Sequence, residues 1–120
     1  MNYITRTKTI VAYVGESFDI KLPMNIGTCL ENVSFDYQDG DRIEFVVVRT
    51  NDSSNNPILL KELNMNDIDE DNNLNIHFDM EDTYYLDPIV YSYFVRVYYT
   101  RDDIEQMKII IPRKTFSLLK

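Results

Sequence analysis

The chain has 120 residues, and 44% of them are hydrophobic, which suits one folded domain with its own core. Its formal net charge is -8, from 20 acidic and 12 basic residues. A field of this sign repels phosphate groups, so we expect neither nucleic acid nor an anionic membrane surface as a partner.

Two-residue alternation of apolar and polar side chains recurs along the chain, with little helical periodicity. The alternation predicts strands at residues 3–13, 17–22, 42–50, 57–63, 74–80, 89–100, 104–111 and 115–119, with a short additional one at 32–35. Residues 38–41, 51–56 and 101–103 have turn or loop compositions, and residues 80–86 suit one helical turn with Asp79 as its N-cap.

Two of these strands are distinctive. Residues 42–50 are apolar on both faces, which is typical of a central strand. Residues 89–100 form the longest strand, with tyrosines on each face. Short connections favour antiparallel pairing. The sequence therefore predicts an all-β fold with one domain over residues 1–120, an antiparallel two-sheet β-sandwich of the immunoglobulin-like type with seven or eight short strands. A small barrel is the alternative.

Cysteine usage and hydropathy limit the remaining classes. Cys29 is the only cysteine, so no internal disulfide can form, and we expect a small buried side chain there. No apolar run approaches the roughly 20 residues of a membrane helix. Residues 1–8 lack the apolar region of a signal peptide. We expect a protein kept in the cytosol of its producer, or released by a route other than secretion.

Residues for catalysis are scarce. His77 is the only histidine, and it falls on the polar side of an alternating strand, where a solvated surface role is the simpler interpretation. Cys29 and His77 could meet in space, but no pattern indicates it. The chain has three glycines and no GxGxxG, P-loop or nucleophile-elbow motif. We therefore predict no enzyme activity, no cofactor and no catalytic residues.

An acidic run invites comparison with a calcium-binding loop. Asp67, Asp69 and Asp71 match the first three ligand positions of an EF-hand. The match then fails, because Asn72 stands at the glycine position and Phe78 at the terminal glutamate position. The sequence predicts a solvated loop and no metal site.

Nine tyrosines are many for this length, and they support two interpretations. In the first interpretation, most of the tyrosines pack in the core or form cross-strand pairs. In the second, some of them form a binding surface. Terminal strands are expected at sheet edges, where exposed backbone groups invite a partner. The predicted protein interface consists of Tyr3, Ile4, Ile10, Tyr84, Tyr85, Tyr98 and Tyr99.

Four stretches resemble one group of proteins. They are residues 15–20 (GESFDI), 39–47 (DGDRIEFVV), 78–86 (FDMEDTYYL) with the tyrosine-rich strand at 91–97, and 109–116 (IIIPRKTF). Their order is similar to that of short virion proteins of phages and prophages of Gram-positive bacteria, which resemble the N-terminal domain of phage baseplate upper proteins. The chain departs from the family at residues 87–89 (DPI), where a Pro-Gly turn is usual.

The resemblance implies an immunoglobulin-like fold and a structural role in a virion, with no catalytic residues to transfer. We expect a tail, baseplate or head accessory protein that docks on other virion proteins, as a symmetric homo-oligomer. It would be found in the virion, and in the host cytoplasm before assembly. The alternative from another class is a carbohydrate-binding or adhesion module with a tyrosine-rich face.

Overall fold

The computed structural model describes residues 3–4, 8–24, 37–51 and 56–120. The chain is mostly β, with two short helical turns. The elements are β1 (Tyr3–Ile4), β2 (Ile10–Tyr13), β3 (Phe18–Pro23), β4 (Arg42–Arg49), β5 (Leu59–Leu63), η1 (Met65–Asp67), β6 (Asn73–Phe78), α1 (Met80–Tyr84), β7 (Val90–Arg101) and β8 (Ile104–Leu119).

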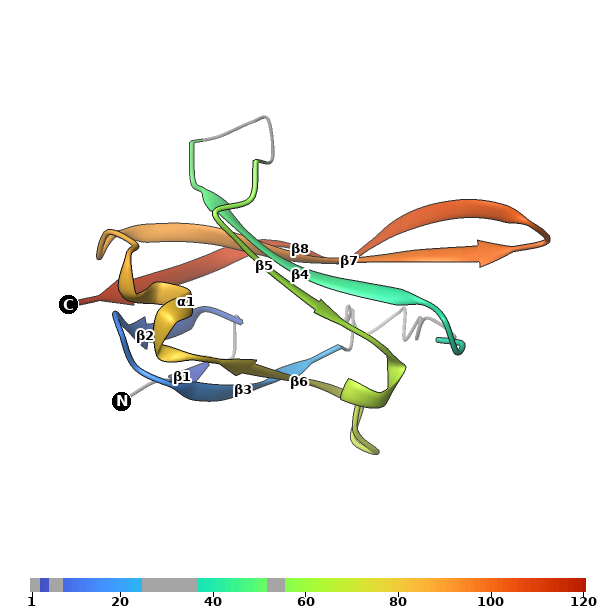
Figure 1. Ribbon diagram of the computed structural model, residues 1–120, viewed down its shortest axis with the longest axis horizontal. Coiled ribbons are helices and arrows are strands. Elements are labelled where there is room, and N and C mark those ends of the chain that lie inside the picture. Colours follow the sequence, from blue (N-terminus) through green and yellow to red (C-terminus); the bar gives the residue numbers. More distant parts are fainter. Residues whose placement is uncertain (1–2, 5–7, 25–36, 52–55) are drawn as a thin grey trace.

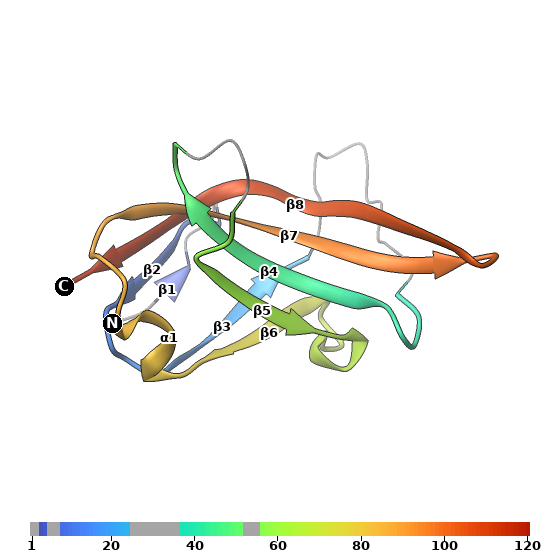
Figure 2. The same cartoon turned by 45° about the horizontal axis from the view of Figure 1, so that its top comes forward.

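The strands form two sheets that face each other (Figure 1). The large sheet has the order β1-β2-β8-β7-β4-β5, and the small sheet pairs β3 with β6. The large sheet curls over the small one, as the turned view shows (Figure 2). The predicted all-β chain with two sheets is therefore confirmed.

The core lies between the sheets and follows the predicted alternation. In the small sheet the burial pattern of β3 alternates residue by residue, and Leu74, Ile76 and Phe78 are buried along β6. Phe18 and Phe78 stack across this pair, with ring centroids 4.6 Å apart. Phe45 of the large sheet meets the edge of Phe78, with centroids 5.6 Å apart, so aromatic rings connect the two layers.

The strand β4 is central, as its apolar faces predict, because it pairs with both β5 and β7. Its inner face belongs to the main core. On its outer face Val46 and Val48 are fully buried beside Phe94 of β7. The tyrosines of β7 also point to both faces of the sheet. Tyr91 and Tyr93 are buried in the core, whereas Tyr98 is half-buried on the outer face.

The helical turn α1 is anchored by a buried threonine. Thr83 is fully buried, and its hydroxyl oxygen accepts a hydrogen bond from the N–H of Gly15 at 2.9 Å. Gly15 has a φ of 77°, in the left-handed region that glycine adopts readily. The predicted start of the helical turn after Asp79 is confirmed, and the Asp79 N–H donates to the carboxylate of Asp82 at 2.8 Å.

Three strand predictions need correction. Residues 3–13 form two short antiparallel strands instead of one, and Lys8 between them has a φ of 62°. The strand β2 then runs parallel to β8, although antiparallel pairing was expected throughout. Pro112 does not end a strand, because β8 continues through it to Leu119 with irregular pairing to β7 nearby. A proline is tolerated where the ladder is irregular.

The last strand was also expected at a sheet edge, and it is not. Phe116 and Ser117 of β8 pair with β2 on one side and with β7 on the other. The predicted strand at 32–35, residue Cys29 and most of the 51–56 loop lie outside the described residues.

Candidate functional site

The most prominent surface feature is the β7–β8 hairpin, whose tip projects beyond the rest of the molecule (Figure 1). Its loop consists of Asp102 and Asp103, with φ values of 53° and 62°. Two consecutive residues with positive φ make the two-residue turn of type I′, whose twist matches that of a hairpin. The predicted hairpin connection is confirmed, without the glycine that usually occupies such a turn.

One edge of this hairpin is open over much of its length. On that side of β8, β2 pairs only with residues 116–119. Within the described part of the chain, no strand lies against the same edge at residues 104–111. Ile104, Met107 and Ile109 are 59%, 48% and 43% exposed. An apolar strand with unpaired backbone groups is suited to pairing with another strand.

An ion pair connects the tip of the hairpin to the turn before β4. The guanidinium of Arg101 donates to both carboxylate oxygens of Asp41, each at 2.9 Å, and Asp41 is only 4% exposed. The N–H of Gln38 donates to the same carboxylate at 2.9 Å. These hydrogen bonds, that of Arg101 foremost, lower the pKa of Asp41. The pair therefore ties the end of β7, next to the hairpin loop, to the turn before β4.

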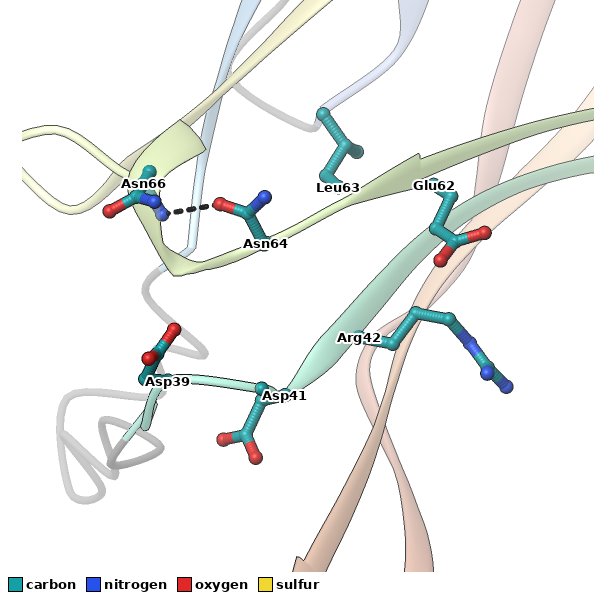
Figure 3. Close-up of a pocket in the computed structure, with 8 residues that line it drawn as sticks. Asp39, Asp41, Arg42, Glu62, Leu63, Asn64 and Asn66 are labelled. Carbon is teal, nitrogen blue, oxygen red and sulfur yellow. Dashed lines mark hydrogen bonds between the residues drawn. The ribbon is translucent and has the colours of Figure 1, made fainter.

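Two shallow polar pockets flank this turn. The larger, of about 390 Å³, is lined by Asp39, Gly40, Asp41, Arg42, Glu62, Leu63, Asn64 and Asn66. In Figure 3 the aspartates approach it from the turn, and Asn64 and Asn66 from the segment after β5. The smaller, of about 170 Å³, lies between the same turn and Tyr98, Tyr99, Thr100 and Arg101. Both are rich in carboxylate, amide and hydroxyl groups, the groups that bind polar ligands.

The outer face of the large sheet carries a band of stacked cations and aromatic rings. Arg42 lies 4.6 Å and Arg96 5.3 Å from the ring centre of Tyr98. Arg96 also donates to the carboxylate of Glu44 at 2.7 Å. Next to this band, an apolar pocket of about 250 Å³ is lined by Phe94, Ile109, Pro112 and Arg113. This apolar pocket adjoins the open edge of β8, because Ile109 belongs to both.

The predicted interface residues are not gathered at one place. Tyr98 and Tyr99 lie on the hairpin, whereas Tyr84 and Tyr85 lie on or after α1, at the opposite end of the molecule (Figure 1). Tyr84 and Tyr85 are 57% and 85% exposed, and their rings meet edge to face at 5.0 Å. They form a second exposed aromatic surface, separate from the hairpin.

The terminal members of the predicted set differ in position. Tyr3 and Ile4 form β1, which is an edge strand of the large sheet. Ile4 is half-buried against the core. Ile10 is fully buried, so its side chain belongs to the core and is not on the surface, a correction that follows from its inward position on β2.

The isolated histidine lies on the polar face of the small sheet, as its place in the alternation predicts. His77 is exposed, and its Nδ1 and Nε2 lie 2.8 Å from Asp19 Oδ1 and 2.9 Å from Asp79 Oδ1. These hydrogen bonds, that to Asp19 first, raise the pKa of His77. The arrangement suits an imidazolium between two carboxylates.

The acidic loop is organised by its own backbone. The carboxylate of Asp69 accepts hydrogen bonds from the N–H groups of Asp71 at 2.9 Å and Asn73 at 3.1 Å. These bonds, with the bond from Asn73 foremost, lower the pKa of Asp69. Over the described residues, no group of three or more histidine, cysteine, aspartate or glutamate side chains is placed to hold a metal ion.

Comparisons of the chain with protein-family models, with curated proteins and with solved structures found no match. A search of the described residues found no helix long and apolar enough to cross a membrane.

Sequence reasoning missed both the open edge of β8 and the Asp41–Arg101 pair. The edge was missed because Pro112 indicated the end of a strand. The sequence therefore predicted two short strands where the structure has one long strand, β8. The sequence does place an oppositely charged residue at each of two predicted turns, with Asp41 next to Gly40 and Arg101 next to Asp102.

Proposed function

We propose that the chain is a non-enzymatic docking domain of a phage virion, and that it attaches to neighbouring virion proteins through the open edge of β8. The observation that carries the proposal is the projecting hairpin, which presents Ile104, Met107 and Ile109 at an edge where no strand of the described residues pairs. Apolar residues at an open edge favour strand addition, in which backbone hydrogen bonds supply affinity and side chains supply specificity.

The immunoglobulin-like part of the proposal is supported by strand order. In a variable-type immunoglobulin sheet, strands G, F, C and C′ are neighbours, and B and E belong to the other sheet. The order β8-β7-β4-β5 and the pair β3-β6 follow this arrangement when the strands are lettered along the chain. The resemblance to phage baseplate proteins, which have such a domain, points to the same fold.

A tyrosine near the start of β7 adds a second, independent support. The hydroxyl of Tyr91 donates to the carbonyl oxygen of Asp87 at 2.8 Å. A tyrosine near the start of strand F that bonds back to the backbone a few residues upstream is a hallmark of immunoglobulin-like domains. Here it holds the turn that leads from α1 into β7.

The proposal is tested by incorporation into particles. Ile109→Lys places a charge at the open edge, and Tyr85→Lys places the same charge at the exposed surface near α1. If both variants keep the wild-type melting temperature, we expect Ile109→Lys to be depleted at least tenfold from purified particles and Tyr85→Lys to be incorporated normally. Absence of the wild-type chain from particles, or normal incorporation of Ile109→Lys, would contradict the proposal.

The predicted terminal contacts are tested separately, by deleting residues 1–8. Tyr3 and Ile4 form the edge strand β1, so the deletion removes the predicted terminal contacts and leaves β2 as the edge of the large sheet. If the truncated domain stays folded and still enters particles at the normal level, the terminal strand is not a docking element and the edge of β8 is sufficient.

A carbohydrate-binding role is the second candidate, favoured by the polar pocket beside Tyr98 and Tyr99. Against it, the ring of Tyr98 is stacked by Arg42, so that face is not open to a sugar. A glycan array decides between the two, because specific binding that is lost in Asp39→Ala and retained in Ile109→Lys would favour the carbohydrate role.

A further inference from the structure

We propose that the exposed tyrosine pair beside α1 binds an arginine side chain of a partner protein, at a contact separate from the open edge of β8. The pair consists of Tyr84 and Tyr85, and Glu81 supplies the carboxylate of the site. The inference goes beyond the docking function, because it assigns a ligand chemistry to the opposite end of the molecule (Figure 1). The domain then connects two different proteins, one at each end.

Short-range contacts fix the position of both rings. The buried hydroxyl of Thr83 accepts from the Gly15 N–H, and the Leu86 N–H donates to the carbonyl oxygen of Thr83 at 2.9 Å. The ring of Tyr84 lies over the turn at Gly15, where an added Cβ would be 3.5 Å from the Tyr84 Cδ2. Tyr85 then meets Tyr84 edge to face. The rings are therefore presented on a fixed support, which reduces the entropy cost of binding.

The aromatic rings and the nearest carboxylate are open to a ligand. Tyr85 is 85% exposed, the highest value among the large hydrophobic side chains of the described residues. Glu81 is exposed and precedes Tyr84 and Tyr85 by three and four residues, which places it on their side of the helical turn. Across the part of the chain that the structure describes, no cation stacks on either ring and none pairs with Glu81.

The charge around the tyrosine pair is negative. Residues 78–95 contain four acidic residues and no lysine or arginine. One of the four, Asp82, pairs with Lys61, whereas Glu81 and Asp87 are exposed. A cation is therefore the ligand that complements this aromatic surface.

The chain itself indicates which cation completes such a site. Two tyrosines near the hairpin tip each form a group with an arginine and a carboxylate. The groups are Tyr98 with Arg42 and Glu44, and Tyr99 with Arg101 and Asp41. The guanidinium carbons lie 4.6 Å and 5.2 Å from the ring centres. A planar guanidinium can lie on a ring and donate to a carboxylate at the same time. Tyr85 and Glu81 supply the ring and the carboxylate of a third group, so its arginine comes from another chain.

Binding of an arginine hexapeptide, followed through the NMR signals of the tyrosine rings, tests the ligand chemistry. The peptide is blocked at both ends and compared with its lysine and citrulline counterparts. Lysine keeps the charge without the planar fork, and citrulline keeps the shape without the charge. We expect the arginine peptide to shift the ring signals of Tyr84 and Tyr85, and the affinity to be about threefold lower or less for either counterpart. Equal binding of all three peptides, or no shift of these rings, would overturn the proposal.

Two substitutions locate the contact. Tyr85→Leu removes the aromatic face and keeps an apolar side chain, and Glu81→Gln removes the charge and keeps the shape. Each should weaken binding of the arginine peptide about threefold, the usual effect of an exposed cation–π contact or ion pair. Glu105→Gln is the matched control, because it removes the same charge at an exposed residue of the hairpin and should leave the affinity unchanged.

Circular dichroism and melting temperature establish that every variant is folded. Equal weakening by Glu81→Gln and Glu105→Gln would show attraction to the overall negative charge and would overturn the assigned site. Unaltered binding by Tyr85→Leu would do the same. Incorporation into particles is a separate readout, because the β8 edge lies at the other end of the molecule. Failure of the arginine contact therefore leaves the docking function standing.

Discussion

Asp41 and Arg101 are 60 residues apart in the sequence and share two hydrogen bonds in the fold. We expect Asp41→Asn to lower the free energy of unfolding by about 1.5–3 kcal/mol, the usual contribution of hydrogen bonds to charged groups. Urea denaturation of both proteins at pH 7 measures the difference. The exposed Asp39→Asn is the control and should be close to neutral.

The effect of Asp41 also depends on pH in a defined direction. The folded pKa of Asp41 lies below its ordinary value of 3.8, so its contribution is complete above that value and is lost as the pH falls through the folded pKa. The stability difference between wild type and Asp41→Asn should therefore be constant near neutrality and decrease in acid. An increase in acid would contradict the assigned ion pair.

His77 has the opposite pH dependence. Its pKa is raised above 6.5 by two aspartates, so its stabilising contribution is complete below pH 6.5 and is lost as the pH rises through the folded pKa. Proton NMR titration of the imidazole should give a folded pKa above that value. We expect the double variant Asp19→Asn, Asp79→Asn to lower this pKa, and an unchanged titration would mean that the contacts do not persist in solution.

At the scale of elements, the hairpin loop holds two aspartates in a backbone conformation that glycine adopts more readily. Asp102 and Asp103 both have positive φ, which costs L-residues about 1–2 kcal/mol, less for aspartate than for most. Replacing Asp103 with glycine should raise the free energy of unfolding by about 0.5–1 kcal/mol. Asp87→Gly is the control, because Asp87 lacks a positive φ and the added flexibility should destabilise it. Equal changes in melting temperature would rule out the turn assignment.

For the whole molecule, stability depends on the aromatic core between the sheets. Phe45 is fully buried and its ring lies 5.0 Å from that of Tyr93 and 5.6 Å from that of Phe78. We expect Phe45→Ala to lower the free energy of unfolding by about 3–5 kcal/mol. Ile104→Ala, at a site 59% exposed, should change it by no more than about 0.5 kcal/mol in the monomer. Comparable losses at both sites would contradict the observed burial.

The alternation of side chains by itself determined the all-β class, the inward faces of β3, β6 and β7, and the central place of β4. These predictions succeeded because strand periodicity is local: alternate residues of one segment point to the same face, so the sequence of that segment shows which face is buried. The turn at residues 38–41 and the helical turn after Asp79 were also predictable, because their signals lie within a few residues.

Only the tertiary structure decided the order of strands, the parallel pairing of β2 with β8 and the open edge at residues 104–111. Each depends on which distant segments meet, and no local pattern contains that information. The same reason explains the Asp41–Arg101 pair and the separation of Tyr84 and Tyr85 from the hairpin tyrosines. Residue types predicted a binding surface, but long-range pairing of strands determined where apolar side chains and unpaired backbone groups lie together.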